Sequence, residues 1–123
     1  MTLEKLNEYL LKIYSKDTCY SKCMDDWNID NLSLGHCAIV SLLVNDYFGG
    51  DIYKIKVDTI SHYFNVINNE IIDLTKNQFN KSIDYTNKEL KTRKEMLNSE
   101  ETLYRYNLLK ERLELLISNN KGE

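Results

Sequence analysis

An apolar segment in the first half of the chain constrains the fold more than any other feature. Ala38 to Phe48 is apolar nearly all round, and its polar exceptions are Ser41, Asn45 and Asp46. A helix with so little polar surface belongs in the interior of a domain. Gly49-Gly50 follows and supplies the positive φ angle that helix C-termini commonly require. The β-branched residues also suit a strand, but the length and the glycine stop favour a buried helix.

A cysteine opens this predicted helix, in the sequence Gly35-His36-Cys37-Ala38. Unpaired backbone N–H groups and the positive end of the helix dipole favour a thiolate at that position, which raises its reactivity. The N–H groups of Cys37 and Ala38 are also placed to hold an oxyanion. The alternative is that Cys37 is a small buried hydrophobic residue, as free cysteines often are.

Three strand candidates follow the helix, at 52–57, 60–67 and 70–74. Asn68-Asn69 is a plausible two-residue turn, because asparagine tolerates left-handed backbone angles. Such a turn pairs residue 67 with 70 and residue 65 with 72, so that 64 lies opposite 73. His62 and Asp73 then share one face of the hairpin and come within reach of each other.

Cys37, His62 and Asp73 together form a candidate catalytic triad. A cysteine nucleophile needs a base to take its proton and a third group to orient that base. His62 suits the role of base and Asp73 that of orienting group, although a hydrogen-bonded structural histidine is the alternative for His62. His36 is adjacent to Cys37 in sequence, but neighbouring helical residues do not face each other. We therefore expect His36 to be a pocket-wall residue or an oxyanion neighbour. Ala38 and Trp27 are the other candidates for the oxyanion site and pocket.

The rest of the chain predicts an α+β fold with flanking helices in one domain over 1–123. Thr2 can cap a first helix that ends near Ser15-Lys16-Asp17. Residues 17–34 are irregular, with the indole of Trp27 tucked against the core. Residues 76–94 predict a loop with a short helix. Asn98 and Glu101 form a capping box for a last helix. Its apolar stripe contains Leu103, Leu109, Leu113 and Leu116, and the tail frays over 119–123.

Composition excludes several classes of protein. The 123 residues are 42% hydrophobic and 28% charged, as in an ordinary soluble domain. No apolar run approaches the roughly 20 residues that span a bilayer, and the N-terminus lacks a secretory pattern, so we expect a cytoplasmic protein without membrane contact. The net charge of −3 gives no footprint for nucleic acid. The basic cluster over 88–94 is typical of a solvated face.

The three cysteines do not predict a disulfide framework, because their number is odd and no export signal precedes them. Cys19 and Cys23 lie four residues apart and would share a face of a helical turn. With His36 and Cys37 they allow a zinc-stabilised module as an alternative, but structural zinc sites use tighter, paired spacings. The triad hypothesis requires no metal and no cofactor.

Several short motifs in the same order resemble those of the YunG family of small bacterial proteins. They are Gly35-His36-Cys37-Ala38, Val44-Asn45-Asp46-Tyr47-Phe48-Gly49-Gly50, Ser61-His62-Tyr63-Phe64-Asn65, Ile72-Asp73-Leu74-Thr75 and Gln78-Phe79. Trp27 upstream and Thr102, Arg105, Tyr106, Leu109 and Arg112 downstream also fit the family pattern. The resemblance spans about residues 27–112. The family typically has Gln where this chain has His36, and Trp where it has Phe64.

This resemblance implies a papain-like or transglutaminase-like core, in which a central helix carries the cysteine and packs on a small antiparallel sheet. It places Cys37, His62 and Asp73 in triad positions and names no substrate. The leading hypothesis is a cysteine-dependent acyl-transfer enzyme, an amide or ester hydrolase, deamidase or transamidase, acting on a peptide, amide or small molecule. The alternative is an inactive binding or scaffold protein with the same core. The oligomeric state stays open, and the C-terminal helix is a candidate dimer surface.

Overall fold

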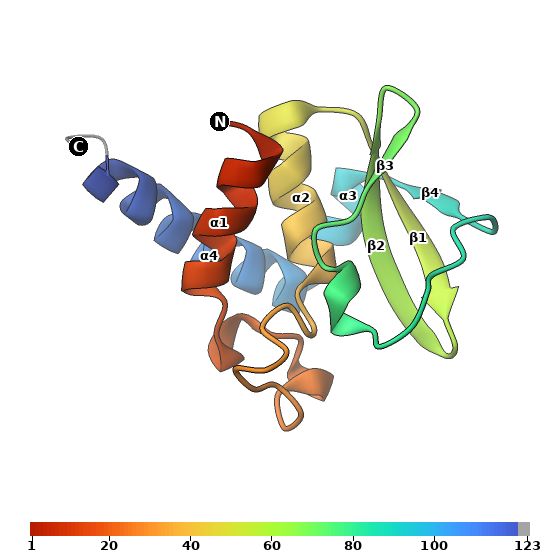
Figure 1. Cartoon of the computed structure of the whole chain (residues 1–123), viewed down its shortest axis with the longest axis horizontal. Helices are drawn as coiled ribbons and strands as arrows, with labels where there is room; N and C mark the ends of the chain where they lie inside the picture. Colours follow the sequence, from red (N-terminus) through yellow and green to blue (C-terminus); the bar gives the residue numbers. More distant parts are fainter. Residues whose placement is uncertain (121–123) are drawn as a thin grey trace.

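The computed structural model describes residues 1–120, which form four helices and a four-stranded antiparallel sheet (Figure 1). The helices lie on one side of the sheet (Figure 1). They are α1 (Leu3–Ile13), α2 (Cys37–Phe48), α3 (Arg93–Leu97) and α4 (Glu100–Asn120). The strands are β1 (Asp51–Val57), β2 (Ile60–Ile67), β3 (Glu70–Ile72) and β4 (Glu89–Lys91). The chain also contains three short 3₁₀ helices, η1 (Lys16–Thr18), η2 (Ser21–Cys23) and η3 (Lys76–Gln78). The coarse α+β prediction is confirmed.

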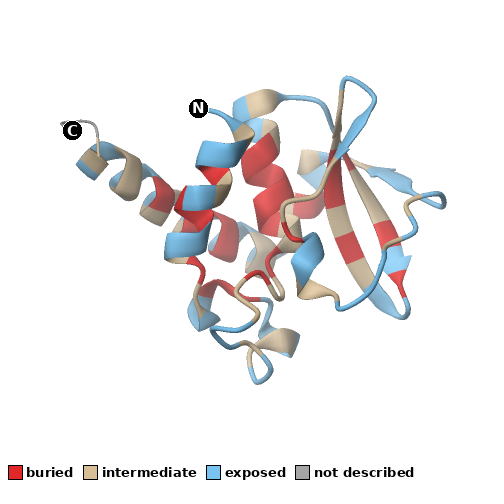
Figure 2. Cartoon of the chain, viewed as in Figure 1, coloured by how far each residue is buried: buried red, intermediate tan, exposed pale blue. Residues whose placement is uncertain are grey.

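Helix α2 is the buried centre of the molecule, as its apolar sequence predicts (Figure 2). Its six residues from Ile39 to Val44 are all buried. Gly49 ends it with φ = 72°. A side-chain hydrogen bond fixes the helix against the sheet, since Asn65 Nδ2 in β2 donates to the Ser41 carbonyl oxygen at 2.9 Å. Helix α2 is therefore held at a defined position relative to β2.

The β2–β3 hairpin has the predicted register. Asn65 pairs with Ile72 and Ile67 with Glu70. Asn68 and Asn69 both take positive φ angles, of 51° and 66°. Strand β3 ends at Ile72, one residue before Asp73. The part of β2 that precedes Asn65, residues 60–64, therefore has no partner strand on that side. This open stretch of β2 is where the candidate site lies.

The fourth strand was not predicted. β4 pairs with β1 at the far edge of the sheet, in the order β3-β2-β1-β4. Its three residues, Glu89 to Lys91, have two charged side chains and no buried one. Such a short edge strand has no apolar alternation for sequence analysis to detect. Its position is set by backbone pairing with β1 instead.

Helix α4 crosses behind α2 and contacts α1, α2, α3 and η1. Its buried residues are Arg105, Tyr106, Leu109 and Leu113. Leu103 is 41% exposed, so its place in the predicted stripe is wrong. The helix continues to Asn120, so residues 119 and 120 are helical rather than frayed, and 121–123 lie outside the described residues.

The capping box predicted for α4 occurs instead at α3, between Thr92 and Glu95. Ser99 provides the side-chain bond at the start of α4, because its Oγ accepts from the Thr102 N–H at 3.2 Å. Glu101 accepts a hydrogen bond from the Ser21 backbone N–H at 2.7 Å. The Asn98–Glu101 prediction therefore fails because a tertiary contact occupies the glutamate.

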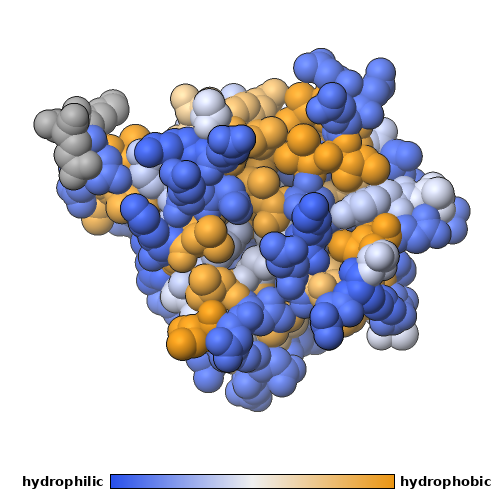
Figure 3. Space-filling model, viewed as in Figure 1, coloured by the Kyte–Doolittle hydropathy of each residue, from blue (hydrophilic) through white to orange (hydrophobic). Residues whose placement is uncertain are grey.

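Apolar residues pack on both faces of the sheet. The larger cluster lies between the sheet and α1, α2 and α4, and the smaller one surrounds Ile55, Val57 and Phe64 on the other face. Residues of the segment after η3, among them Phe79 and Tyr85, cover the smaller cluster. Figure 3 shows hydrophilic residues over most of the periphery and hydrophobic ones gathered toward the middle of this view. No helix within residues 1–120 is long and apolar enough to cross a membrane.

Candidate active site

Cys37 is the first residue of α2 and lies beside the open stretch of β2. Its Sγ is 3.9 Å from the Ser61 carbonyl oxygen. The residue is partly exposed, and it lines a cavity. Helix geometry leaves the first N–H groups of α2, those of Cys37 and Ala38, without intrahelical acceptors. The thiol is therefore accessible and lies next to backbone donors suited to an anion.

The loop before Cys37 is fixed by Gly35, which has φ = 74°. A Cβ atom there would lie 2.5 Å from Cys19 Sγ, so the position requires glycine for space as well as for conformation. The Gly35 carbonyl oxygen accepts from the Tyr20 N–H at 3.0 Å and from Arg105 Nη1 at 3.2 Å. These bonds hold the start of α2, and with it Cys37, against the loop and α4.

His62 and Asp73 are in contact, as the hairpin register predicts. His62 Nε2 lies 2.7 Å from Asp73 Oδ2, and the two side chains are 0% and 3% exposed. Asp73 Oδ2 also accepts from the Tyr85 hydroxyl at 2.8 Å, and its Oδ1 accepts from the Thr75 N–H at 3.3 Å. The ring of Phe79 meets the imidazole edge-on, with centroids 4.9 Å apart. The imidazole is thus fixed in orientation, with Nδ1 left for other partners.

The surroundings of His62 raise its pKa from 6.5 to about 9. Burial lowers the pKa, but the hydrogen bond to Asp73 and the charges of Cys37 and Asp73 outweigh it. Cys37 is thus one of the groups whose charge raises the pKa of the imidazole. At neutral pH the ring carries a proton that it can share with a thiolate.

Gln78 is a site residue that the reasoning from residue types missed. Its Nε2 lies 3.4 Å from His62 Nδ1 and 3.2 Å from Thr75 Oγ1, and its Oε1 accepts from the Gly35 N–H at 3.3 Å. It belongs to η3 and lines the cavity with Cys37. A lone glutamine in a polar loop gives no chemical signal. Its place in the Gln78-Phe79 motif is the one feature of the sequence that pointed to it.

The structure does not place His36 in the cavity. Its ring is fully buried, with Nδ1 2.9 Å from the Leu34 carbonyl oxygen and Nε2 2.7 Å from Thr18 Oγ1. It also packs against Tyr14, with ring centroids 4.7 Å apart. Burial lowers the pKa of His36 to about 4, so the ring is neutral. The predicted wall or oxyanion role is therefore wrong, because the side chain turns into the interior.

Trp27 also lies away from the cavity. Its Nε1 donates to the Leu32 carbonyl oxygen at 2.8 Å, and the ring packs against the larger core cluster. This agrees with the predicted tucked indole but not with a pocket role. Ala38, in contrast, lines the cavity beside Cys37.

The remaining two cysteines lie near Gly35 and are not bonded to each other by a disulfide. Burial raises the pKa of Cys19 to about 12 and also raises that of Cys23. His36 cannot join them as a zinc ligand in this conformation, since both of its nitrogens have protein partners. Within residues 1–120, no group of three or more His, Cys, Asp or Glu side chains is arranged to hold a metal ion.

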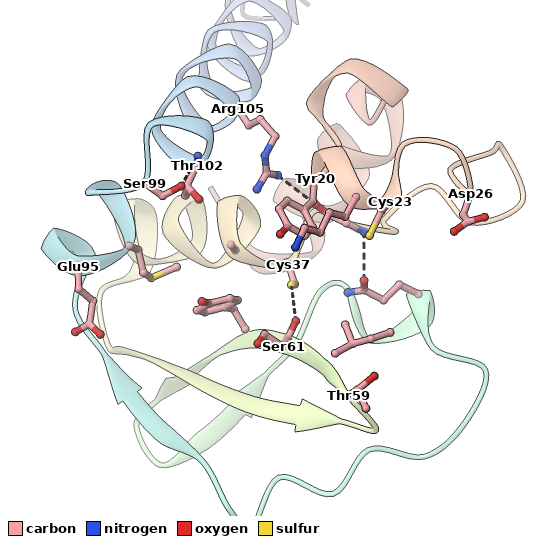
Figure 4. Close-up of a pocket in the computed structure, with 17 residues that line it drawn as sticks. Tyr20, Cys23, Asp26, Cys37, Thr59, Ser61, Glu95, Ser99, Thr102 and Arg105 are labelled. Carbon is pink, nitrogen blue, oxygen red and sulfur yellow. Dashed lines mark hydrogen bonds between the residues drawn. The ribbon is translucent and has the colours of Figure 1, made fainter.

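The cavity in front of Cys37 has a volume of about 710 Å³ (Figure 4). In Figure 4, α4 contributes Thr102 and Arg105 on one side of Cys37, and β2 contributes Ser61 on the opposite side. Tyr20 and Cys23 line it from the irregular segment before α2. The volume is sufficient for a small molecule or a short peptide segment.

Sequence comparisons identify relatives of this chain. A family model described as YunG protein matches residues 2–118. The "Uncharacterized protein YunG" of Bacillus subtilis (strain 168) is 32% identical over 80 residues, which cover 65% of this chain and 70% of that protein. No solved structure gives a significant match. With nearly its whole length matched by the family model, the chain belongs to the YunG family.

Proposed function

We propose that the chain is a cysteine-dependent acyl-transfer enzyme, with Cys37 as nucleophile, His62 as acid and base, and Asp73 as orienting group. The observation that carries this proposal is the buried 2.7 Å contact between His62 and Asp73 beside a partly exposed thiol. A His62–Asp73 pair with a purely structural role would not require a partly exposed Cys37 and a cavity in front of it. The substrates are amides or esters of a peptide or small molecule.

In the acylation step, the Cys37 thiolate attacks the substrate carbonyl carbon and a C–S bond forms. The carbonyl π electrons move to the oxygen, which the N–H groups of Cys37 and Ala38 are placed to stabilise. The bond to the leaving amine or alcohol then breaks, and that group takes the proton from His62 Nδ1. A thioester on Cys37 and a neutral imidazole remain.

In the second step, water or an amine attacks the thioester. His62 Nδ1, now neutral, removes a proton from the nucleophile, and the C–S bond breaks. Cys37 leaves as a thiolate and the acid or new amide departs. Asp73 keeps its contact with Nε2 throughout, so the same nitrogen of the ring faces the reaction in both steps.

The Gln78 amide has two arrangements that fit this cycle. In the neutral ring, Nδ1 accepts from Gln78 Nε2 at 3.4 Å, a long and therefore weak hydrogen bond. When the ring is protonated, Nδ1 becomes a donor and the thiolate is its acceptor. The released amide is then free to donate to the substrate oxyanion, next to the N–H groups of α2.

We also propose that the core is papain-like or transglutaminase-like. The support is the order of the elements: a buried helix that begins at the cysteine, followed by an antiparallel hairpin that carries the histidine and the aspartate. This arrangement supports acyl transfer as the reaction class, and the choice among hydrolysis, deamidation and transamidation depends on which nucleophile enters the cavity.

An acyl-enzyme test examines the proposal without a known substrate. The protein is mixed with p-nitrophenyl acetate and analysed by mass spectrometry after rapid quenching. We expect a single acetyl group on Cys37, released over time with continued p-nitrophenol production. Cys37→Ser and His62→Ala should each remove the acetyl-Cys37 signal, while Cys23→Ser, the matched control for a cavity thiol, should retain it.

Equal acetylation of the two cavity cysteines would overturn the proposal, whereas a stable thioester would narrow it to acyl transfer without hydrolysis. If Cys37 is acetylated no faster than Cys23 in the folded protein, the site does not activate the thiol, and the chain is a binding protein with this core. If Cys37 is acetylated rapidly but the thioester never turns over, the site transfers an acyl group without hydrolysing it, and added amines should release it.

A further inference from the structure

The cavity in front of Cys37 contains a buried arginine with unused hydrogen-bonding capacity. Arg105 is 5% exposed and lines the cavity from α4. Its Nη1 donates to the carbonyl oxygens of Thr18 and Gly35, each at 3.2 Å. Its Nε forms a salt bridge with Glu101 Oε1 at 3.7 Å, which is too long for a hydrogen bond, and Nε is buried without a hydrogen-bond partner. Arg105 therefore has donors that the described residues do not satisfy.

Nη2 is the remaining nitrogen of the guanidinium. Within residues 1–120 it has no hydrogen-bond acceptor, and it is not among the buried unpartnered atoms, so it is accessible. Figure 4 shows the guanidinium of Arg105 extending from α4 toward Cys37, above Tyr20. The guanidinium carbon is 5.6 Å from the centre of the Tyr20 ring, which supports it from one side.

The position of Arg105 relative to the nucleophile is fixed by the backbone. Nη1 holds the carbonyl of Gly35, and Gly35 precedes Cys37 by two residues. The Cα atoms of Gly35 and Cys37 are therefore at most about 7.6 Å apart. Burial lowers the pKa of Arg105, and Cys37 is among the groups whose charge raises it. A group bound at Nη2 would therefore share the cavity with the thiol, which Arg105 and Cys37 both line.

Other polar groups in the cavity favour an anion on this side. Thr102 lies one turn before Arg105 on α4 and lines the cavity, and its hydroxyl has no partner within residues 1–120. Lys22 adds a second positive charge to the lining. Of the acidic lining residues, Glu95 and Asp26 lie at the two outer edges in Figure 4. Glu95 is also paired with Lys91 at 3.2 Å.

We propose that Arg105 and Thr102 bind a carboxylate on the substrate, so that this site acts on acidic acyl compounds or on peptides with an acidic residue beside the reacting bond. The inference rests on the proposed role of Cys37 as nucleophile. A guanidinium presents paired donors that match a carboxylate, and a desolvated arginine holds that charge more strongly than an exposed lysine does. Arg105 is then a specificity-determining residue as well as an anchor for the loop that positions Cys37.

Three maleimides of similar size test the charge preference at Cys37. They are N-ethylmaleimide, which is neutral, 3-maleimidopropionate, which carries a carboxylate, and N-(2-aminoethyl)maleimide, which carries an ammonium group. Each adds to the thiol across its double bond with no leaving group. Labelling rates at Cys37 are mapped by mass spectrometry and divided by the rates for 2-mercaptoethanol, which corrects for intrinsic reactivity.

We expect the corrected rate of the carboxylate reagent to exceed that of the neutral one by about tenfold or more, as one charge-assisted hydrogen bond supplies. The ammonium reagent should be slower than the neutral one. The carboxylate reagent should also saturate with concentration and be slowed by added propionate. Arg105→Gln should abolish the preference, whereas Lys22→Gln, which removes one positive charge from the same cavity, should retain most of it.

Equal corrected rates for the three reagents, or rates insensitive to propionate, would overturn the inference. These wild-type measurements decide it even if Arg105→Gln does not fold. A loss of preference in Lys22→Gln equal to that in Arg105→Gln would also contradict it, because general charge would then explain the effect. Fast labelling by N-ethylmaleimide without charge preference would leave the proposed enzyme standing. Slow labelling by N-ethylmaleimide together with a strong preference for the carboxylate reagent would support the anion site and contradict the proposed activation of Cys37.

Discussion

The two histidines of this chain have opposite environments, and the difference assigns their roles. His62 is paired with the carboxylate of Asp73, which raises its pKa to about 9. His36 is buried between the neutral partners Leu34 and Thr18, and burial lowers its pKa to about 4. His62 is therefore protonated at neutral pH, as its proposed role as an acid requires, whereas His36 is a neutral structural group.

His36→Gln tests the structural role of His36. Glutamine can donate to the Leu34 carbonyl and accept from the Thr18 hydroxyl, but it has no proton to gain. Because the folded pKa of His36 lies below 6.5, its contribution to stability is present above pH 6.5 and is lost as the pH falls through about 4. Between pH 6.5 and about 4, the free energy of unfolding of the wild type should fall by about 2 kcal/mol more than that of the variant.

Urea denaturation at several pH values measures this difference. The hydrogen bond from Arg112 lowers the pKa of Asp17. Carboxylates of this kind reduce the stability of both proteins in acid by the same amount, so their effect cancels in the difference. Parallel stability curves for the two proteins would contradict the assignment. His36→Gln should also leave the alkylation rate of Cys37 within about twofold, because the ring does not line the cavity.

Gln78→Met separates oxyanion stabilisation from activation of the thiol. Methionine has nearly the volume of glutamine but cannot donate a hydrogen bond. Acetylation of Cys37 passes through a tetrahedral oxyanion. The variant should therefore slow it by about 10- to 100-fold, up to the rate loss that removal of one oxyanion donor causes in other enzymes. Alkylation by a neutral reagent forms no oxyanion and should be nearly unchanged. Equal losses in both reactions would show that Gln78 acts through His62.

At the scale of elements, the loop that joins η2 to α2 determines where Cys37, the proposed nucleophile, lies. Gly35→Ala combines a positive φ angle with a Cβ atom 2.5 Å from Cys19 Sγ. Gly49→Ala is the matched control, because Gly49 has φ = 72° but no atom within 4 Å of the added Cβ. The control should cost about 1–3 kcal/mol from backbone strain alone. Gly35→Ala should cost more and should also slow alkylation of Cys37.

Thermal or urea unfolding gives the stability of each glycine variant, and site-resolved labelling gives the reactivity. The position of Cys37 depends on Gly35 through its bonds to Tyr20 and Arg105, whereas Gly49 lies at the opposite end of α2. Full reactivity in a folded Gly35→Ala protein would show that this loop does not position the nucleophile.

The elements that sequence analysis predicted are those with a local signal. The apolar run and Gly49 predicted α2, and Asn68-Asn69 predicted the register that brings His62 to Asp73. β4 was missed because an exposed three-residue edge strand has no pattern of its own. The orientation of His36 and the position of Gln78 were missed because both depend on contacts between segments far apart in the chain.

At the scale of the whole molecule, the charge state of the site is linked to folding. The folded pKa of His62 lies above 6.5, so its contribution to stability is complete below pH 6.5 and is lost as the pH rises through about 9. Asp73→Asn removes the carboxylate that raises this pKa. The stability difference between wild type and Asp73→Asn should therefore be largest at pH 6.5 and shrink by about 2 kcal/mol toward pH 9.

Urea unfolding of both proteins across this range measures the linkage. Tyr85→Phe is a suitable control, because it removes a neutral donor to Asp73 and leaves the carboxylate in place. Its stability difference from wild type should depend on pH much less than that of Asp73→Asn. A pH-independent difference for Asp73→Asn would mean that the pair does not hold a proton in the folded protein.

The measurement that tests the central claim most directly is the alkylation rate of each cysteine by iodoacetamide at pH 6.5, resolved by mass spectrometry. If His62 and Asp73 activate the thiol, Cys37 should react at least about tenfold faster than Cys19 or Cys23, since thiolate rather than thiol is the nucleophile. His62→Ala should remove that advantage in a protein that still folds. Equal rates at the three cysteines, unaffected by His62→Ala, would contradict the account.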